Sequence, residues 1–205
     1  LLGVAAHQRG DYHRAVDCIR RAIAQNDAFA PYHSNLGAAY RSMGRLDDAI
    51  ACYREALRRN PRAAEVHFNL ANALKEKESL LEAADGYRQA VDLKPDWADP
   101  WIALAETLRR QDRHDEAAAC CRRALAIQPE SAEAEFQLGG ALRAQGNSID
   151  AMEHYARAVA LQPAFVEARI NLGCVYDDLG ELDRAVDAYD QALALKPDSA
   201  AARFN

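Results

Sequence analysis

The sequence predicts an all-α protein, an α-solenoid of six helix–turn–helix units of 34 residues each. Alanine, the residue with the highest helix propensity, is very frequent, and aromatic residues make up only 7% of the 205 residues. Small residues also recur every 34 positions without an insertion. Because a single helix pair cannot bury both of its faces, such units must stack on one another.

The 34-residue period is visible in columns of small residues. In every unit a glycine or alanine follows a leucine, and two alanine columns come twelve and nineteen residues later. The glycine/alanine column is Gly3, Gly37, Ala71, Ala105, Gly139 and Gly173. Five of the six units close with a proline, from Pro61 to Pro197. We expect one domain over residues 1–205, made of a partial unit (1–29), full units (30–63, 64–97, 98–131, 132–165 and 166–199) and the start of a seventh (200–205).

Residues 30–63 show why each unit should form a pair of helices. Apolar residues from Tyr32 to Tyr40 recur at intervals of three and four, which predicts a first helix with one buried face. Gly44 suits the left-handed residue that ends a helix. A second apolar stripe, from Leu46 to Leu57, predicts the second helix. Pro61 ends it, because proline has no amide hydrogen and clashes with the preceding turn.

The third and fourth units depart from this pattern. Glu78 and Asp112 stand where the turn glycine is expected, and Cys121 replaces a packing tyrosine. Gly86 interrupts a predicted second helix, where glycine costs roughly 1 kcal/mol relative to alanine. A flexible or recognition-bearing centre is one interpretation. We favour ordinary drift in a repeat array that tolerates it.

Charge and hydropathy exclude two kinds of partner. The 31 acidic residues outnumber the 25 basic ones, which gives a net charge of −6. Proteins that bind the phosphate backbone usually carry a basic surplus, so we expect no nucleic-acid partner. No stretch approaches eighteen uninterrupted apolar residues, so we expect no membrane-spanning helix. The five cysteines are not spaced as a disulfide framework, which favours a reducing, cytoplasmic location.

No residues are arranged for catalysis or metal binding. Cys18, Cys52 and Cys120 occupy equivalent positions in three units, so they should lie about a helix pair apart, too far to share a metal. The six histidines do not form an acid–base–nucleophile set. We therefore expect no catalytic residue, no metal, no cofactor and no enzymatic activity, with the cysteines acting as small packing residues.

The repeat pattern resembles the tetratricopeptide repeat family over essentially the whole chain. Trp101 matches the tryptophan that this family prefers early in the first helix. The resemblance implies a right-handed superhelix whose first helices line a concave groove. It also implies a scaffold that binds a protein or peptide partner, because the family serves many partners without chemistry of its own.

Helical spacing from the buried leucines selects the side chains that should face this groove. A primary amide offers two hydrogen-bond donors and an acceptor without charge, so a row of amides can hold the main chain of an extended peptide. Two other interpretations remain open: the amides only join one first helix to the next, and the basic residues only complement helix dipoles. The predicted peptide-binding residues are the amides Asn35, Asn69, Asn72, Gln137 and Asn171 and the basic rim Arg41, Lys75, Arg109 and Arg143.

An asparagine before the Leu-Gly/Ala pair is also similar to the superhelical arm of O-linked N-acetylglucosamine transferases. Asn69–Lys77 and Asn171–Tyr176 carry this likeness, while Ala103 lacks the amide. The resemblance implies an alternative function, a substrate-docking arm of a larger glycosyltransferase whose catalytic domain is absent here.

The ends of the sequence suggest a piece of a longer protein. The chain enters partway through a first helix and stops as a seventh unit begins. An exposed apolar end face around Tyr189, Ala192 and Leu193 should then favour end-to-end self-association.

Overall fold

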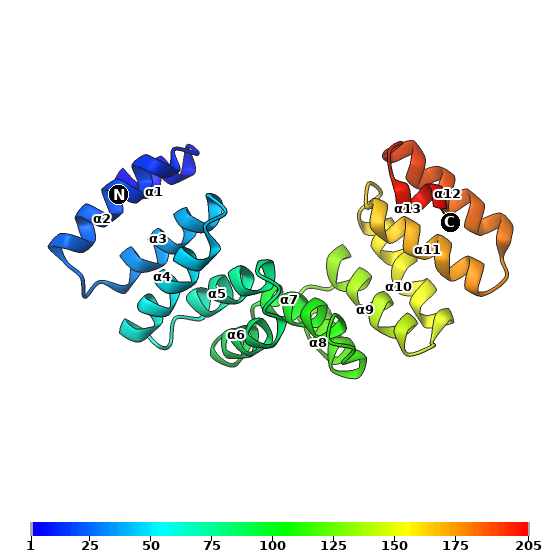
Figure 1. Ribbon diagram of the computed structural model, residues 1–205. Coiled ribbons are helices and arrows are strands. Elements are labelled where there is room, and N and C mark those ends of the chain that lie inside the picture. Colours follow the sequence, from blue (N-terminus) through cyan, green and yellow to red (C-terminus); the bar gives the residue numbers. More distant parts are fainter. Residues whose placement is uncertain (1, 205) are drawn as a thin grey trace. The chain divides into compact units, whose positions relative to one another are not determined.

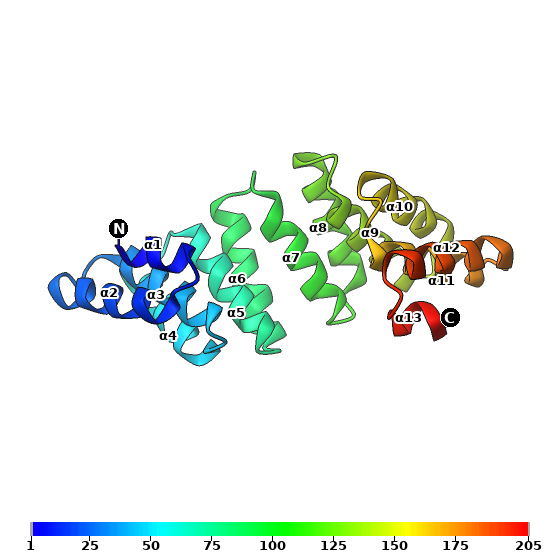
Figure 2. The same ribbon diagram turned by 90° about the horizontal axis from the view of Figure 1, so that it is seen from above.

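A computed structural model describes residues 2–204, and within this range all of the regular secondary structure is α-helical. The helices follow one another as hairpins (Figures 1 and 2), which confirms the predicted all-α repeat fold. The chain divides into two compact units between Asp96 and Trp97, close to a predicted repeat boundary. Among the helices described, none combines the length and the apolar character needed to cross a membrane.

The N-terminal unit contains three hairpins, α1–α2, α3–α4 and α5–α6. Each helix packs against the next along the chain, and α3 also packs against α5, so the first helices of neighbouring repeats lie side by side. The helices are α1 (Leu2–Gln8), α2 (Tyr12–Gln25), α3 (Ala30–Ser42), α4 (Leu46–Arg59), α5 (Ala64–Glu76) and α6 (Leu80–Leu93).

The C-terminal unit repeats this arrangement, with α7 against α9 and α9 against α11. A short helix, α13, packs against α12. The helices are α7 (Ala98–Arg109), α8 (His114–Ile127), α9 (Ala132–Ala144), α10 (Ser148–Leu161), α11 (Val166–Asp178), α12 (Leu182–Leu195) and α13 (Ala200–Phe204).

In the turn inside each hairpin, one residue has the left-handed backbone conformation, at the position where the sequence predicts a turn glycine. Gly44 has φ +72°, and the amide of Arg45 donates to the carbonyl of Tyr40 at 2.9 Å, which closes the helix end. Glu78 and Asp112 take the same conformation, with φ of +62° and +59°. These two turns therefore keep the left-handed backbone conformation of the turn glycine, although residues with a Cβ atom disfavour that conformation.

Glu78→Gly is therefore expected to raise the free energy of unfolding by about 1 kcal/mol, because glycine adopts positive φ without steric cost. Urea denaturation followed by circular dichroism measures the change. Gly44→Glu is the matched control, and it should cost a similar amount. Equal stability of Glu78→Gly and the parent chain would show that the side chain bears no strain.

Close packing within each hairpin places tyrosine rings over small residues. A Cβ atom added to Gly37 would lie 2.8 Å from the Tyr53 ring, and one added to Gly173 would lie 2.6 Å from the Tyr189 ring. In the repeat at 64–97 the glycine/alanine column has an alanine, and the residue that faces it from the second helix is a glycine. Ala71 faces Gly86, whose added Cβ would lie 2.9 Å from the Ala71 Cβ.

Two of the three residues of the predicted apolar end face are buried, and the third, Leu193, is half-buried. Tyr189 is 7% exposed and Ala192 is fully buried, because α12 packs against both α11 and α13. The exposed aliphatic side chains of α12 are Leu182, Val186 and Leu195 instead. End-to-end self-association stays a prediction, now without the surface first assigned to it.

Candidate functional site

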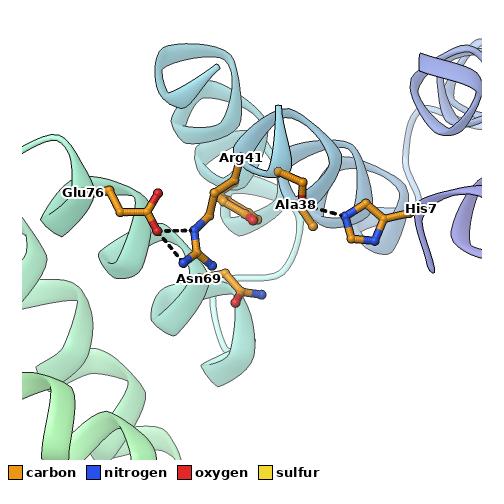
Figure 3. A pocket seen from close by; sticks show the side chains of 7 residues that line it. His7, Ala38, Arg41, Asn69 and Glu76 are labelled. Atoms are coloured by element: carbon orange, nitrogen blue, oxygen red, sulfur yellow. Dashed lines mark hydrogen bonds and ion pairs between the residues drawn. The ribbon is translucent and has the colours of Figure 1, made fainter. Parts of the chain in front are cut away.

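A pocket lies on the face that the first helices α1, α3 and α5 present in the N-terminal unit. It has a volume of about 370 Å³. Figure 3 shows Arg41 and Asn69, two predicted peptide-binding residues, directed toward the same space from neighbouring helices, with His7 across from them. The lining residues are His7, Ala38, Arg41, Ser42, Tyr53, Asn69 and Glu76.

The predicted amides of the N-terminal unit retain hydrogen-bonding capacity. Asn35 is half-buried in α3 and Asn69 lines the pocket from α5, and neither forms a hydrogen bond within residues 2–204. Asn72 accepts a hydrogen bond from the Tyr87 hydroxyl at 2.7 Å. Its two N–H donors are not used in that bond. This face therefore presents unused amide donors and acceptors.

The predicted amides of the C-terminal unit are engaged within the protein. Gln137 is only 5% exposed, and its amide donates to Glu133 at 2.7 Å and accepts from Arg109 at 3.4 Å. Asn171 donates to the carbonyl of Glu167, one turn earlier in α11, at 2.9 Å. Gln137 therefore uses both its amide oxygen and an N–H within the protein, whereas Asn171 uses a single N–H.

The predicted basic rim joins successive first helices. Arg41 donates to Glu76 from Nε at 2.8 Å, and Arg143 donates to Asp178 from Nε at 2.8 Å. Both pairs are 35 residues apart, so each base bonds a residue one position past its own equivalent in the next repeat. The hydrogen bond that Arg143 donates to the Asp178 carboxylate raises the pKa of Arg143.

The remaining residues of the rim lie in the last turns of other first helices. Lys75 is half-buried near the end of α5, and Arg109 ends α7. His7 and Ser42, whose side chains are 3.0 Å apart, repeat the 35-residue separation. Complementing the helix dipole therefore does not account fully for these side chains. An acidic residue 35 positions after an arginine, as Glu76 follows Arg41 and Asp178 follows Arg143, is the sequence signal that could have revealed these two pairs.

Tyr53, which the sequence places only in the core stripe of α4, forms part of the pocket. Its side chain is buried, with 1% of the residue exposed, and burial raises the pKa of the phenol to about 12. The nearby Arg41 opposes that shift, and Glu76 adds to it. The hydroxyl is therefore neutral at physiological pH and can both donate and accept a hydrogen bond.

The cysteines have the environment of packing residues. Cys120 and Cys121 are buried, and Cys18, Cys52 and Cys174 are partly buried. Burial raises the pKa of Cys121 to about 12 and that of Cys52 to about 11, so these thiols are protonated and weakly nucleophilic at neutral pH. Across the described residues, His, Cys, Asp and Glu do not gather in a group that could hold a metal ion.

Comparison with known families finds the same repeat along the chain. Sequence profiles described as tetratricopeptide repeat match residues 1–30, 64–96, 98–164 and 166–199, and one described as TPR repeat matches residues 37–78. No curated protein sequence matches significantly.

Solved structures share the fold over most of the chain. YrrB, described as a TPR protein with an unusual peptide-binding site, is 25% identical, with a TM-score of 0.75 over 92% of this chain and 97% of that one. MamA is also 25% identical, with a TM-score of 0.73 over 80% of this chain and 96% of that one. PilF of Pseudomonas aeruginosa, at 19% identity and a TM-score of 0.84, covers 99% of this chain and 92% of its own, and shows the fold alone.

Proposed function

This chain belongs to the tetratricopeptide repeat family, and from that premise we propose that it is an interaction scaffold that binds an extended peptide on the face formed by α1, α3 and α5. The observation that carries the proposal is the pocket in which Arg41 and Asn69 meet. The description of YrrB as having a peptide-binding site supports the same class of function.

The amides give this face a means of holding main chain. Asn35 and Asn69 occupy the same position in consecutive repeats, 34 residues apart, on helices that lie near each other. Each amide can donate to a peptide carbonyl and accept from a peptide N–H, independently of the peptide's side chains. Binding through such bonds tolerates many peptide sequences.

The experiment that tests this function measures peptide capture by the whole chain. An array of 12-residue peptides identifies binders, and fluorescence anisotropy then gives the dissociation constants. Replacing Asn35 and Asn69 together with alanine should weaken binding about tenfold, since two hydrogen bonds of roughly 0.5–1.5 kcal/mol each are lost. Helicity should not change, because neither amide bonds to the rest of the described chain.

Asn171→Ala is the matched control, because it removes the equivalent amide in the C-terminal unit, where the side chain bonds its own helix. This variant should keep the affinity of the parent. A double variant that binds as tightly as the parent, or a control that loses as much affinity, would contradict the assignment to α1, α3 and α5.

A further inference from the structure

The repeats differ in the hydrogen-bond partner that they provide for the hydroxyl group of the buried tyrosine. In the repeat at 64–97, the Tyr87 hydroxyl donates to the side chain of Asn72 at 2.7 Å. In the repeat at 166–199, Tyr189 is hydrogen-bonded to Cys174, which occupies the position equivalent to Asn72. The residue at this position of the first helix thus provides the partner for the tyrosine below it.

The repeat at 30–63 has no such partner. The position equivalent to Asn72 is Ala38, whose methyl group cannot form a hydrogen bond. The Tyr53 hydroxyl has no hydrogen-bond partner among the residues that the structure describes, although the side chain is 1% exposed. Ala38 and Tyr53 both line the pocket, so the missing side chain leaves an opening above the hydroxyl.

A comparable opening in the C-terminal unit is covered. The equivalent residues there are Gly140 and Tyr155, and a Cβ added to Gly140 would lie 3.5 Å from the Tyr155 hydroxyl. It would also lie 3.2 Å from Cδ and 3.4 Å from Nε of Arg109. The arginine therefore occupies the space beside that tyrosine. The residue in the same relation to Tyr53, 46 positions earlier, is His7, whose Nε2 lies 3.0 Å from the Ser42 hydroxyl oxygen.

The pocket above Tyr53 combines donors and acceptors without unpaired fixed charge. Arg41 and Glu76 neutralise each other through bonds from Nε and Nη2 to a single carboxylate oxygen, which leaves the second oxygen able to accept. Tyr53 offers a neutral hydroxyl, and Asn69 offers both amide functions. A guest that donates and accepts, and that is itself uncharged, satisfies all of these groups.

We propose that this pocket takes a primary carboxamide side chain, from asparagine or glutamine, of the bound peptide, and that Tyr53 selects it. The carboxamide oxygen accepts from the Tyr53 hydroxyl and its NH₂ group donates to the Glu76 oxygen. A carboxylate or an ammonium group would lose hydration here without meeting an uncompensated opposite charge, and an apolar side chain would leave the Tyr53 hydroxyl unpaired. This inference rests on the proposed function, because the carboxamide belongs to a peptide on the same face.

Four synthetic peptides test the selection. The probe is acetyl-(Ser-Gln)₅-amide, and its counterparts carry alanine, glutamate or lysine in place of every glutamine. Titrations are followed by ¹H–¹⁵N NMR of the whole chain. The glutamine peptide should bind at least fivefold more tightly than each of the other three.

Two variants locate the selection at Tyr53. Tyr53→Phe should weaken binding of the glutamine peptide about fivefold, without changing the unfolding transition, because no hydrogen bond of the unbound chain is lost. Ala38→Asn should reproduce the Asn72–Tyr87 bond, close the opening and remove the preference for glutamine. Tyr155→Phe, the equivalent change in the C-terminal unit, is the matched control and should leave the affinity unchanged.

Equal binding of the glutamine and alanine peptides would overturn the inference and leave the proposed function standing, since main chain alone would then be recognised. Tighter binding of the glutamate peptide would also overturn it, because the guest would be a carboxylate. A Tyr53→Phe variant that retains the parent's affinity and preference overturns the role of the hydroxyl. If no peptide of the array and none of the four probes binds, the proposed function fails with it.

Discussion

Gly37→Ala is expected to lower the free energy of unfolding by about 2–3 kcal/mol, the largest effect of a single methyl group that we predict. The added Cβ would lie 2.8 Å from both Cδ1 and Cε1 of Tyr53 and 3.1 Å from Cζ. The ring cannot move aside easily, because Tyr53 is 1% exposed and its helix, α4, packs closely against α3. Urea denaturation monitored by circular dichroism measures the loss, and hydrogen exchange of α3 and α4 localises it.

The chain itself suggests the control for this variant. In the repeat at 98–131 the equivalent pair is Ala105 and Cys121, an alanine facing a small side chain. Tyr53→Cys alone leaves a cavity, but combined with Gly37→Ala it copies that natural pair. The two changes together should therefore cost about 2 kcal/mol less than the sum of their separate costs. Additive costs, or a Gly37→Ala variant as stable as the parent, would contradict a clash with the ring.

Gly86→Ala is expected to lower the free energy of unfolding by about 1–2 kcal/mol, although helix propensity alone predicts a gain of about 1 kcal/mol. The Cβ of the new residue would lie 2.9 Å from the Ala71 Cβ and 3.4 Å from the His67 carbonyl oxygen. Two helix backbones would have to separate to admit it. Urea denaturation measures whether Gly86→Ala lowers or raises the free energy of unfolding, and this sign separates the two expectations.

Ala71→Gly supplies the matched background for this second prediction. With the Ala71 methyl group removed, the site regains the glycine found at Gly37 in the preceding repeat. In that background Gly86→Ala should stabilise the chain, because helix propensity then acts without the clash. A stabilising effect of Gly86→Ala in both backgrounds would show that Gly86 is ordinary drift.

Much of the fold could be predicted because each helix boundary is a local property of the chain. Gly44, Pro61 and their equivalents end helices through their own backbone chemistry, and the structure begins and ends its helices close to them. Glu78 and Asp112 were recognised as replacements of turn glycines, and they adopt the same positive φ. The cost expected for Gly86 counted helix propensity alone, whereas the contact with Ala71 is between helices and no local rule contains it.

The candidate site was predictable in part. Helical spacing selected Arg41 and Asn69, and both line one pocket. The same spacing selected Gln137, whose amide is bonded on both sides in the C-terminal unit. The columns alone could not separate these cases, because repeats with equivalent positions differ in their neighbours. Tyr53 was assigned to the core, and its ring is indeed buried, but its hydroxyl opens into the pocket through the absence of a side chain at Ala38.

The sequence by itself determined the period, the helix–turn–helix units and the face on which amides recur, since these follow from residue spacing and from backbone preferences within one unit. Only the tertiary structure decided which side chains already have partners. Arg41 forms a hydrogen bond with Glu76, 35 residues away, and Asn72 forms one with Tyr87. The Tyr53 hydroxyl has no hydrogen-bond partner among the described residues. Such pairings depend on how far one helix is displaced against its neighbour, a distance set by packing between repeats.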